Sequence, residues 1–73
     1  MKKSFRIILT PESEGGFTVM VPSLPGCITW GENIEHAKLM AREAIDVYLE
    51  ELQANGEPIP DDTNSLELSL LVD

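Results

Sequence analysis

Two segments near the N-terminus alternate apolar and polar side chains, which is the pattern of a strand with one buried face. They cover residues 5–10 and 17–21. Pro11 and the pair Gly15 and Gly16 lie between them and favour a turn, because proline fixes φ and glycine permits positive φ. We therefore predict a β-hairpin over residues 5–21.

The middle of the chain predicts a short third strand followed by one long helix. Residues 27–30 are β-prone, and from Ile34 onwards apolar residues recur at helical spacing. Asn33 is suited to cap the helix start, because its side chain can accept a hydrogen bond from a free backbone N–H. Gly56 favours a helix stop. We expect a helix over residues 34–54.

A last alternating segment, residues 66–72, predicts a fourth strand. The element order is then βββαβ, an α+β fold in one domain over residues 1–73. We expect a four-stranded mixed sheet with the long helix packed on one face. The other face carries Ile8, Met20 and Leu71, with Ile28 or Trp30 beside them. It is either a self-association or partner surface, or a solvated face with scattered apolar residues.

Length and charge narrow the classes of function. The chain has 73 residues, with 13 acidic against 5 basic side chains and a formal net charge of −8. Nucleic-acid affinity depends largely on Lys and Arg, so we expect no direct nucleic-acid binding. An acidic surface favours a basic protein partner. A chain of this size buries only roughly 60% of its unfolded surface, so we expect a homo-oligomer, a dimer or higher.

Targeting and redox signals are sparse. No apolar run approaches the roughly 18 residues that a membrane span needs, and the basic start is too brief for a secretory signal. A single cysteine, Cys27, cannot form an internal disulfide. We expect a cytoplasmic protein with no membrane association.

Candidate catalytic groups show no recognised spacing. The carboxylates on predicted loops are Glu12, Glu14, Glu32, Asp61 and Asp62. They form no EF-hand or Walker pattern, so a solvated acidic surface is favoured over a cation site. Cys27 and His36 lie nine positions apart with no third orienting group, and a buried structural cysteine is the commoner role. We expect no catalytic residue, no metal site and no cofactor.

Residues 15–27 resemble a stretch of the HicB-like antitoxin family, GGF-x-V-x-x-P-x-LPGC. The resemblance continues to either side and covers nearly the whole chain, from Phe5 to Val72. The further matching positions are Thr29, Gly31, residues 34–37, residues 41–45 and residues 58–60. As a block this match is specific, although no single piece of it is.

The resemblance implies a partial ribonuclease-H-like fold and the antitoxin half of a type II toxin–antitoxin pair. The implied partner is HicA, a small basic domain that is similar to double-stranded-RNA-binding domains. The resemblance implies that HicA cleaves mRNA with a histidine. Many family members carry a C-terminal DNA-binding domain, and this chain stops at Asp73, so we expect that domain to be lacking. Trp30 stands where the family usually has a smaller residue, and His36 stands within its Glu-Glu-Ala stretch.

The leading hypothesis is a non-catalytic antitoxin that binds and occludes a HicA-type toxin. Expected exposure suggests six partner-binding residues: Glu12, Glu14, Met20, Leu24, Trp30 and Glu32. One alternative is an orphan homo-oligomeric protein-interaction module without a toxin partner. Another is a metal-dependent nuclease that uses loop carboxylates such as Asp61 and Asp62.

Overall fold

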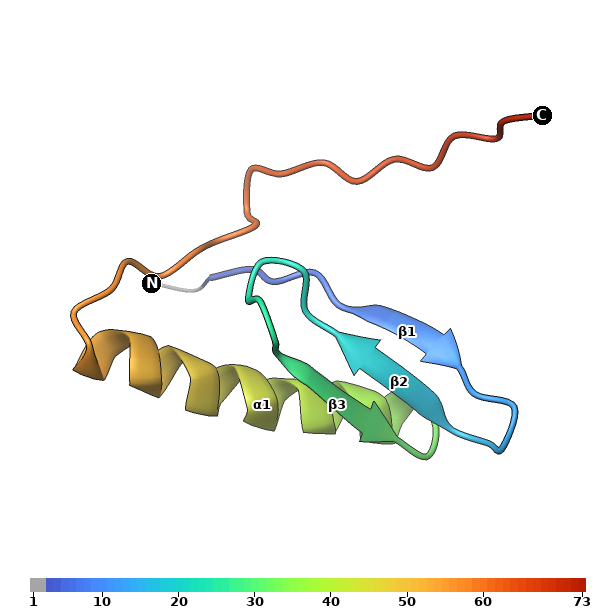
Figure 1. Cartoon of the computed structure of the whole chain (residues 1–73), viewed down its shortest axis with the longest axis horizontal. Coiled ribbons are helices and arrows are strands. Elements are labelled where there is room, and N and C mark those ends of the chain that lie inside the picture. Colours follow the sequence, from blue (N-terminus) through green and yellow to red (C-terminus); the bar gives the residue numbers. More distant parts are fainter. Residues whose placement is uncertain (1–2) are drawn as a thin grey trace.

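A three-stranded antiparallel sheet packs one face against a single long helix in the computed structural model, which describes residues 3–73 (Figure 1). The sheet order is β1-β2-β3. The elements are β1 (Ile8–Pro11), β2 (Phe17–Met20), β3 (Ile28–Gly31) and α1 (Ile34–Ala54). The α+β class, the hairpin, the third strand and the helix on one face are therefore confirmed.

The first strand is shorter than its alternating pattern predicts. In the β1–β2 register Ile8 lies opposite Met20 and Leu9 lies opposite Val19. Residues 5–7 precede β1, because the chain that would pair with them turns away at Pro22. Their alternation reflects burial of one side, since Phe5 and Ile7 pack against the core.

The core lies between the sheet and α1 and is built from small or medium apolar residues. Val19 packs with Ala37 and Ala41 of the helix, and Ile7 and Leu9 border this cluster. A second cluster holds Val21, Leu24 and Cys27. Helix and sheet approach each other closely at Gly31, where a Cβ would lie 2.3 Å from the Ala37 Cα atom.

The helix begins and ends where its sequence signals predict. The Asn33 side chain accepts a hydrogen bond of 2.8 Å from the His36 backbone N–H, which satisfies one free donor of the first turn. At the other end the chain reverses through Gly56, whose φ of 68° is costly for a residue with a Cβ. The bounds of α1, Ile34 and Ala54, thus coincide with the cap and stop signals in the sequence.

The predicted fourth strand is wrong for this structure. Residues 66–73, which we call the tail, are extended but pair with no strand among the described residues (Figure 1). Leu66, Leu68 and Leu70 are each at least 84% exposed. The sheet is therefore three-stranded and antiparallel, rather than four-stranded and mixed. Alternation identifies a segment suited to be a strand, but it does not supply the neighbour that completes the ladder.

Candidate protein-binding surface

The sheet face opposite α1, which we call the outer face, carries an uncovered row of apolar side chains. The register places Ile8 beside Met20 and Met20 beside Ile28 across the three strands. Met20 is 42% and Ile28 61% exposed. The next row along the strands joins Thr18 to Trp30, which is 45% exposed. A contiguous apolar strip of this kind is typical of a protein-binding surface.

An acidic turn lies at one end of this strip, where β1 connects to β2. Glu12 and Glu14 border a shallow hollow of about 380 Å³, and Thr18 and Trp30 line it from the outer face. The Thr18 hydroxyl donates a hydrogen bond of 2.6 Å to Glu12, which orients that carboxylate. The structure thus combines two acidic side chains and an aromatic ring in one surface depression.

Two contacts hold the Trp30 ring in place, one with Gly16 and one with His36. Its ring lies over Gly16, where a Cβ would come within 2.2 Å of the ring carbon Cζ2. The His36 imidazole meets it edge to face, with ring centroids 6.5 Å apart. His36 is itself oriented, because its Nδ1 accepts a hydrogen bond of 2.9 Å from the Glu32 backbone N–H. Trp30 is therefore a positioned aromatic group, the type of residue enriched among interface anchors.

The six residues predicted to contact a partner lie in four different places, three of them exposed. Glu12, Glu14 and Trp30 come together in the hollow, whereas Met20 lies in the neighbouring apolar row. Glu32 is exposed just beyond the end of β3.

Leu24 does not reach the outer face or any other surface. Its side chain is 0% exposed and packs with Val21 and Cys27. The loop folds back through hydrogen bonds from the Leu24 N–H to the Val21 carbonyl and from the Cys27 N–H to the Leu24 carbonyl. A loop rich in proline and glycine suggested exposure, but these bonds turn its one large apolar side chain into the core.

Sequence reasoning left open whether Ile28 or Trp30 joins the outer face, and the structure places both there. The spacing of two residues between Ile28 and Trp30 was the signal that could have predicted this placement. Side chains two positions apart in one strand share a face, so either both are on the outer face or neither is.

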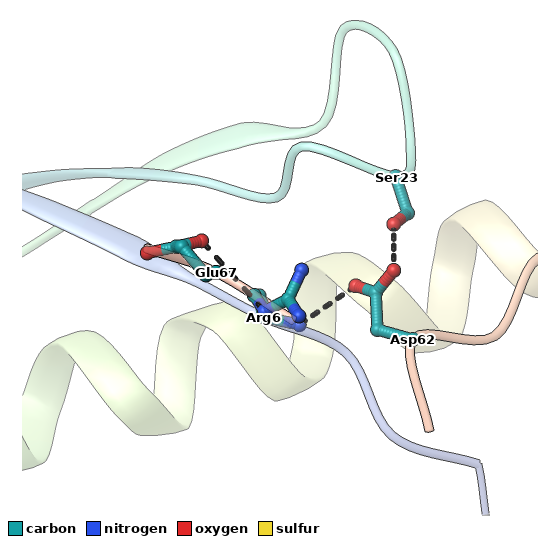
Figure 2. Close-up of polar contacts among 4 residues, drawn as sticks. All are labelled: Arg6, Ser23, Asp62 and Glu67. Carbon is teal, nitrogen blue, oxygen red and sulfur yellow. Dashed lines mark hydrogen bonds and ion pairs between the residues drawn. The ribbon is translucent and has the colours of Figure 1, made fainter. Parts of the chain in front are cut away.

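Asp61 and Asp62 serve the fold as hydrogen-bond acceptors. Asp61 accepts from the Ser4 N–H at 3.0 Å and from the Thr63 hydroxyl at 2.6 Å. Asp62 accepts from the Arg6 N–H at 3.0 Å and from the Ser23 hydroxyl (Figure 2). These bonds favour the charged form and lower the pKa of both carboxyls, through Thr63 above all for Asp61 and through Arg6 above all for Asp62.

The remaining candidate groups are dispersed. Cys27 lies in the core at 5% exposure, and burial raises the pKa of its thiol. His36 lies at the start of α1 beside Trp30. Within residues 3–73, no three His, Cys, Asp or Glu side chains gather in a way that could hold a metal ion. Over the same residues, α1 is too polar to serve as a membrane span.

Comparison with known proteins shows the family to which the chain belongs. Residues 5–70 match the family described as "HicB_like antitoxin of bacterial toxin-antitoxin system". A UPF0150 protein of Thermoplasma acidophilum is 38% identical over 66 residues, covering 90% of this chain and 94% of the relative. A UPF0150 protein of Synechocystis is 36% identical over 70 residues, covering 94% of this chain and 89% of the relative. The chain belongs to the HicB-like antitoxin family.

Proposed function

We propose that this chain is a non-catalytic, cytoplasmic antitoxin that binds a small basic mRNA-cleaving toxin of the HicA type and occludes its active site. The observation that carries the proposal is the combination on the outer face. An acidic turn with Glu12 and Glu14 directly adjoins an exposed apolar strip with Trp30 and Met20. Family membership supports the antitoxin role, and the net charge of −8 supports a basic partner.

The two parts of this surface do different work in the proposed complex. The acidic side chains are exposed, so their attraction to a basic partner mainly accelerates association and is weakened by salt. The apolar strip loses its water when the partner binds, and this burial mainly slows dissociation. Occlusion requires no catalytic step from this chain. It requires only that the chain stays bound to the toxin and covers its active site.

Growth rescue tests the role directly. A small basic reading frame adjacent to the gene is the toxin that the proposal requires, and it is expressed in cells with and without this chain. We expect the neighbour alone to arrest growth and co-expression to restore it. Arrest without rescue would rule out the antitoxin role for that pair.

The surface is tested by charge reversal with a matched control. Glu12→Lys combined with Glu14→Lys is compared with Glu50→Lys combined with Glu51→Lys, an equal charge change near the end of α1. We expect the first pair to slow association at low salt about tenfold or more, with the difference shrinking at high salt. The helix pair should change association far less. Equal effects would mean that net charge acts without a defined acidic contact.

The exposed tail also favours self-association, so an orphan homo-oligomeric interaction module is the second candidate. The two candidates differ in what they require of the toxin. The orphan module predicts oligomers and no rescue by co-expression, whereas the antitoxin predicts rescue whether or not oligomers form.

A further inference from the structure

β3 is the edge strand of the sheet on the side away from β1, and part of its backbone faces outward (Figure 1). The Val21 N–H donates a hydrogen bond of 3.1 Å to the Cys27 carbonyl, so the Cys27 carbonyl faces β2. Backbone groups of successive residues in a strand alternate between its two sides. Those of Thr29 therefore face β2 as well, whereas those of Ile28 and Trp30 face away from it. We call the N–H and C=O groups of Ile28 and Trp30 the open edge of β3.

A side chain closes this edge at its far end. Glu32 follows Trp30 by two residues, and its N–H donates a hydrogen bond of 2.9 Å to Nδ1 of His36. The next N–H group in the outward series thus already has a partner within the chain. An incoming strand would find four backbone groups to pair with, two at Ile28 and two at Trp30.

A hollow of about 390 Å³ lies between β3 and α1. Its apolar lining consists of Cys27, Ile28, Met40, Ala44 and Val47. Ile28 and Val47 are each 61% exposed, so the described part of the chain leaves both of them largely uncovered. A strand that paired with the open edge of β3 would direct alternate side chains toward this hollow. Backbone pairing and apolar cover are therefore available at the same place.

The charged side chains that line this hollow are negative. Glu43 and Glu51 border it from α1, and no Lys or Arg among residues 3–73 does so. The basic side chains lie elsewhere: Lys3 and Arg42 line a different hollow beside Phe5, Arg6 lies 3.7 Å from Glu67, and Lys38 lies 3.8 Å from Glu35. The hollow therefore favours a basic segment over an acidic one. The tail of this chain carries Glu67 and Asp73 and no basic residue, so it does not match.

The two glutamates also define a spacing. Glu43 and Glu51 are eight residues apart in one helix, which places them about 12 Å apart along its axis. Side chains four residues apart in an extended strand lie on one face, separated by about 13 Å. Ala44 and Val47 lie between the glutamates along α1 and line the same hollow. A segment with basic residues at positions i and i+4 and an apolar residue at i+2 would fit this arrangement.

We propose that the open edge of β3 and the adjoining hollow bind an extended basic segment of a second protein partner. The segment adds to the sheet as a fourth strand and carries the pattern basic-x-apolar-x-basic on the face that meets the hollow. This inference goes beyond the proposed function, because the site lies at the edge and on the helix side of β3. An added strand extends the outer face without covering it, so the chain can hold this segment and the toxin together.

A peptide probe tests strand addition on the full chain. The probe is a capped peptide of seven residues, with lysine at its second and sixth positions, valine at its fourth and threonine elsewhere. In an NMR titration we expect saturable shifts of the Ile28 and Trp30 amides. At saturation these amides should exchange with solvent at least about tenfold more slowly, because their N–H groups are then hydrogen-bonded. The absence of saturable shifts at these amides overturns the proposal.

Methylated peptides separate strand pairing from general charge attraction. One version carries methyl groups on its odd-numbered backbone nitrogens and the other on its even-numbered ones, with no change in charge. A strand pairs with its neighbour through alternate residues only, so one version should lose binding while the other retains it. Equal binding of the two versions would show that no ladder forms, and would overturn the proposal.

Charge variants test the two glutamates. Glu43→Gln combined with Glu51→Gln is compared with Asp46→Asn combined with Glu50→Gln, an equal charge change at positions of α1 that do not line this hollow. We expect the Kd for the lysine peptide to rise about fivefold or more in the first variant and to change little in the second. Equal effects would overturn the assigned charge pattern. Growth rescue by the antitoxin is measured separately, so failure of this site leaves the proposed function standing.

Discussion

The Trp30 ring packs directly on the backbone at Gly16, in a space that a methyl group would fill: an added Cβ would lie 2.2 Å from Cζ2 and 2.8 Å from the Gly31 carbonyl oxygen. Gly16 also has a φ of 76°, a conformation that L residues rarely adopt. One small residue therefore sets both the shape of the hairpin turn and the position of the aromatic ring on the outer face.

Gly16→Ala is expected to destabilise the fold and to displace Trp30. The φ alone costs about 1–3 kcal/mol, and the contact with the ring adds to it. Trp30 is the only tryptophan, so the fluorescence of the chain reports on this ring. Displacement of the ring into water should shift its emission to longer wavelength. Gly15→Ala is the control, because Gly15 also has positive φ but nothing within 4 Å of an added Cβ. Urea titration followed by fluorescence measures both. Identical losses in the two variants would mean that the ring does not depend on this contact.

Gly31→Ala tests the close approach of β3 and α1. The added methyl group would meet the Ala37 Cα at 2.3 Å and its N at 2.4 Å, and backbone atoms cannot rotate away. We expect a loss of about 1–3 kcal/mol in unfolding free energy, as for an overpacked core. Adding Ala37→Gly should not restore stability, because the nearest atoms belong to the backbone. Recovery in the double variant would show that only the side chains conflict.

Asp62→Asn is expected to lower the melting temperature at neutral pH and to flatten its dependence on acid. Hydrogen bonds hold the pKa of Asp62 below the ordinary value, so its contribution is present above that value, about pH 4. As pH falls further through the lowered pKa, this contribution is lost. Thermal unfolding from pH 7 to pH 2 measures both curves. Glu57→Gln, an exposed position in the same loop, controls for removal of one charge.

Cys27 is expected to react slowly with thiol reagents while the chain is folded. The side chain is buried with Val21 and Leu24, and burial raises the pKa of the thiol, so little thiolate is present at neutral pH. Labelling with a chromogenic disulfide should accelerate at least about 100-fold in denaturant, because a core thiol becomes accessible only when the fold opens. Rapid labelling of the native chain would indicate that the second core cluster opens readily.

Local signals predicted most of the fold. The bounds of the helix could be predicted from the Asn33 cap, the regular apolar spacing and the Gly56 stop, all of which act within a few residues. The hairpin followed from alternation on both sides of a glycine turn. The tail has an equally clear alternation, but a strand also needs a neighbour. The sequence does not state whether that neighbour lies in the same chain.

The candidate surface was predictable wherever strand parity determines which side chains share a face. Met20 and Trp30 follow that rule, and the hairpin turn brings Glu12 and Glu14 to the same side as Trp30. Strand parity does not determine the direction of the Leu24 side chain, because the loop after β2 has no repeating geometry. Only its hydrogen bonds to Val21 and Cys27 determine that its side chain points inward.

The hydrogen bonds of Asp61 and Asp62 to the segment before β1 have a consequence for colloidal behaviour. Asp61 and Asp62 occupy the outward N–H groups of Ser4 and Arg6, and the hairpin turn ends the strand after Pro11. Within β1, Ile8 and Thr10 direct their backbone groups toward β2 and Pro11 has no N–H, so Leu9 alone offers an N–H to an incoming chain. Long, flat, unprotected edges nucleate fibrils, whereas such a short one, flanked by fixed carboxylates, gives little template for open-ended stacking. A leucine-rich tail is thus compatible with a protein that stays dispersed at high concentration.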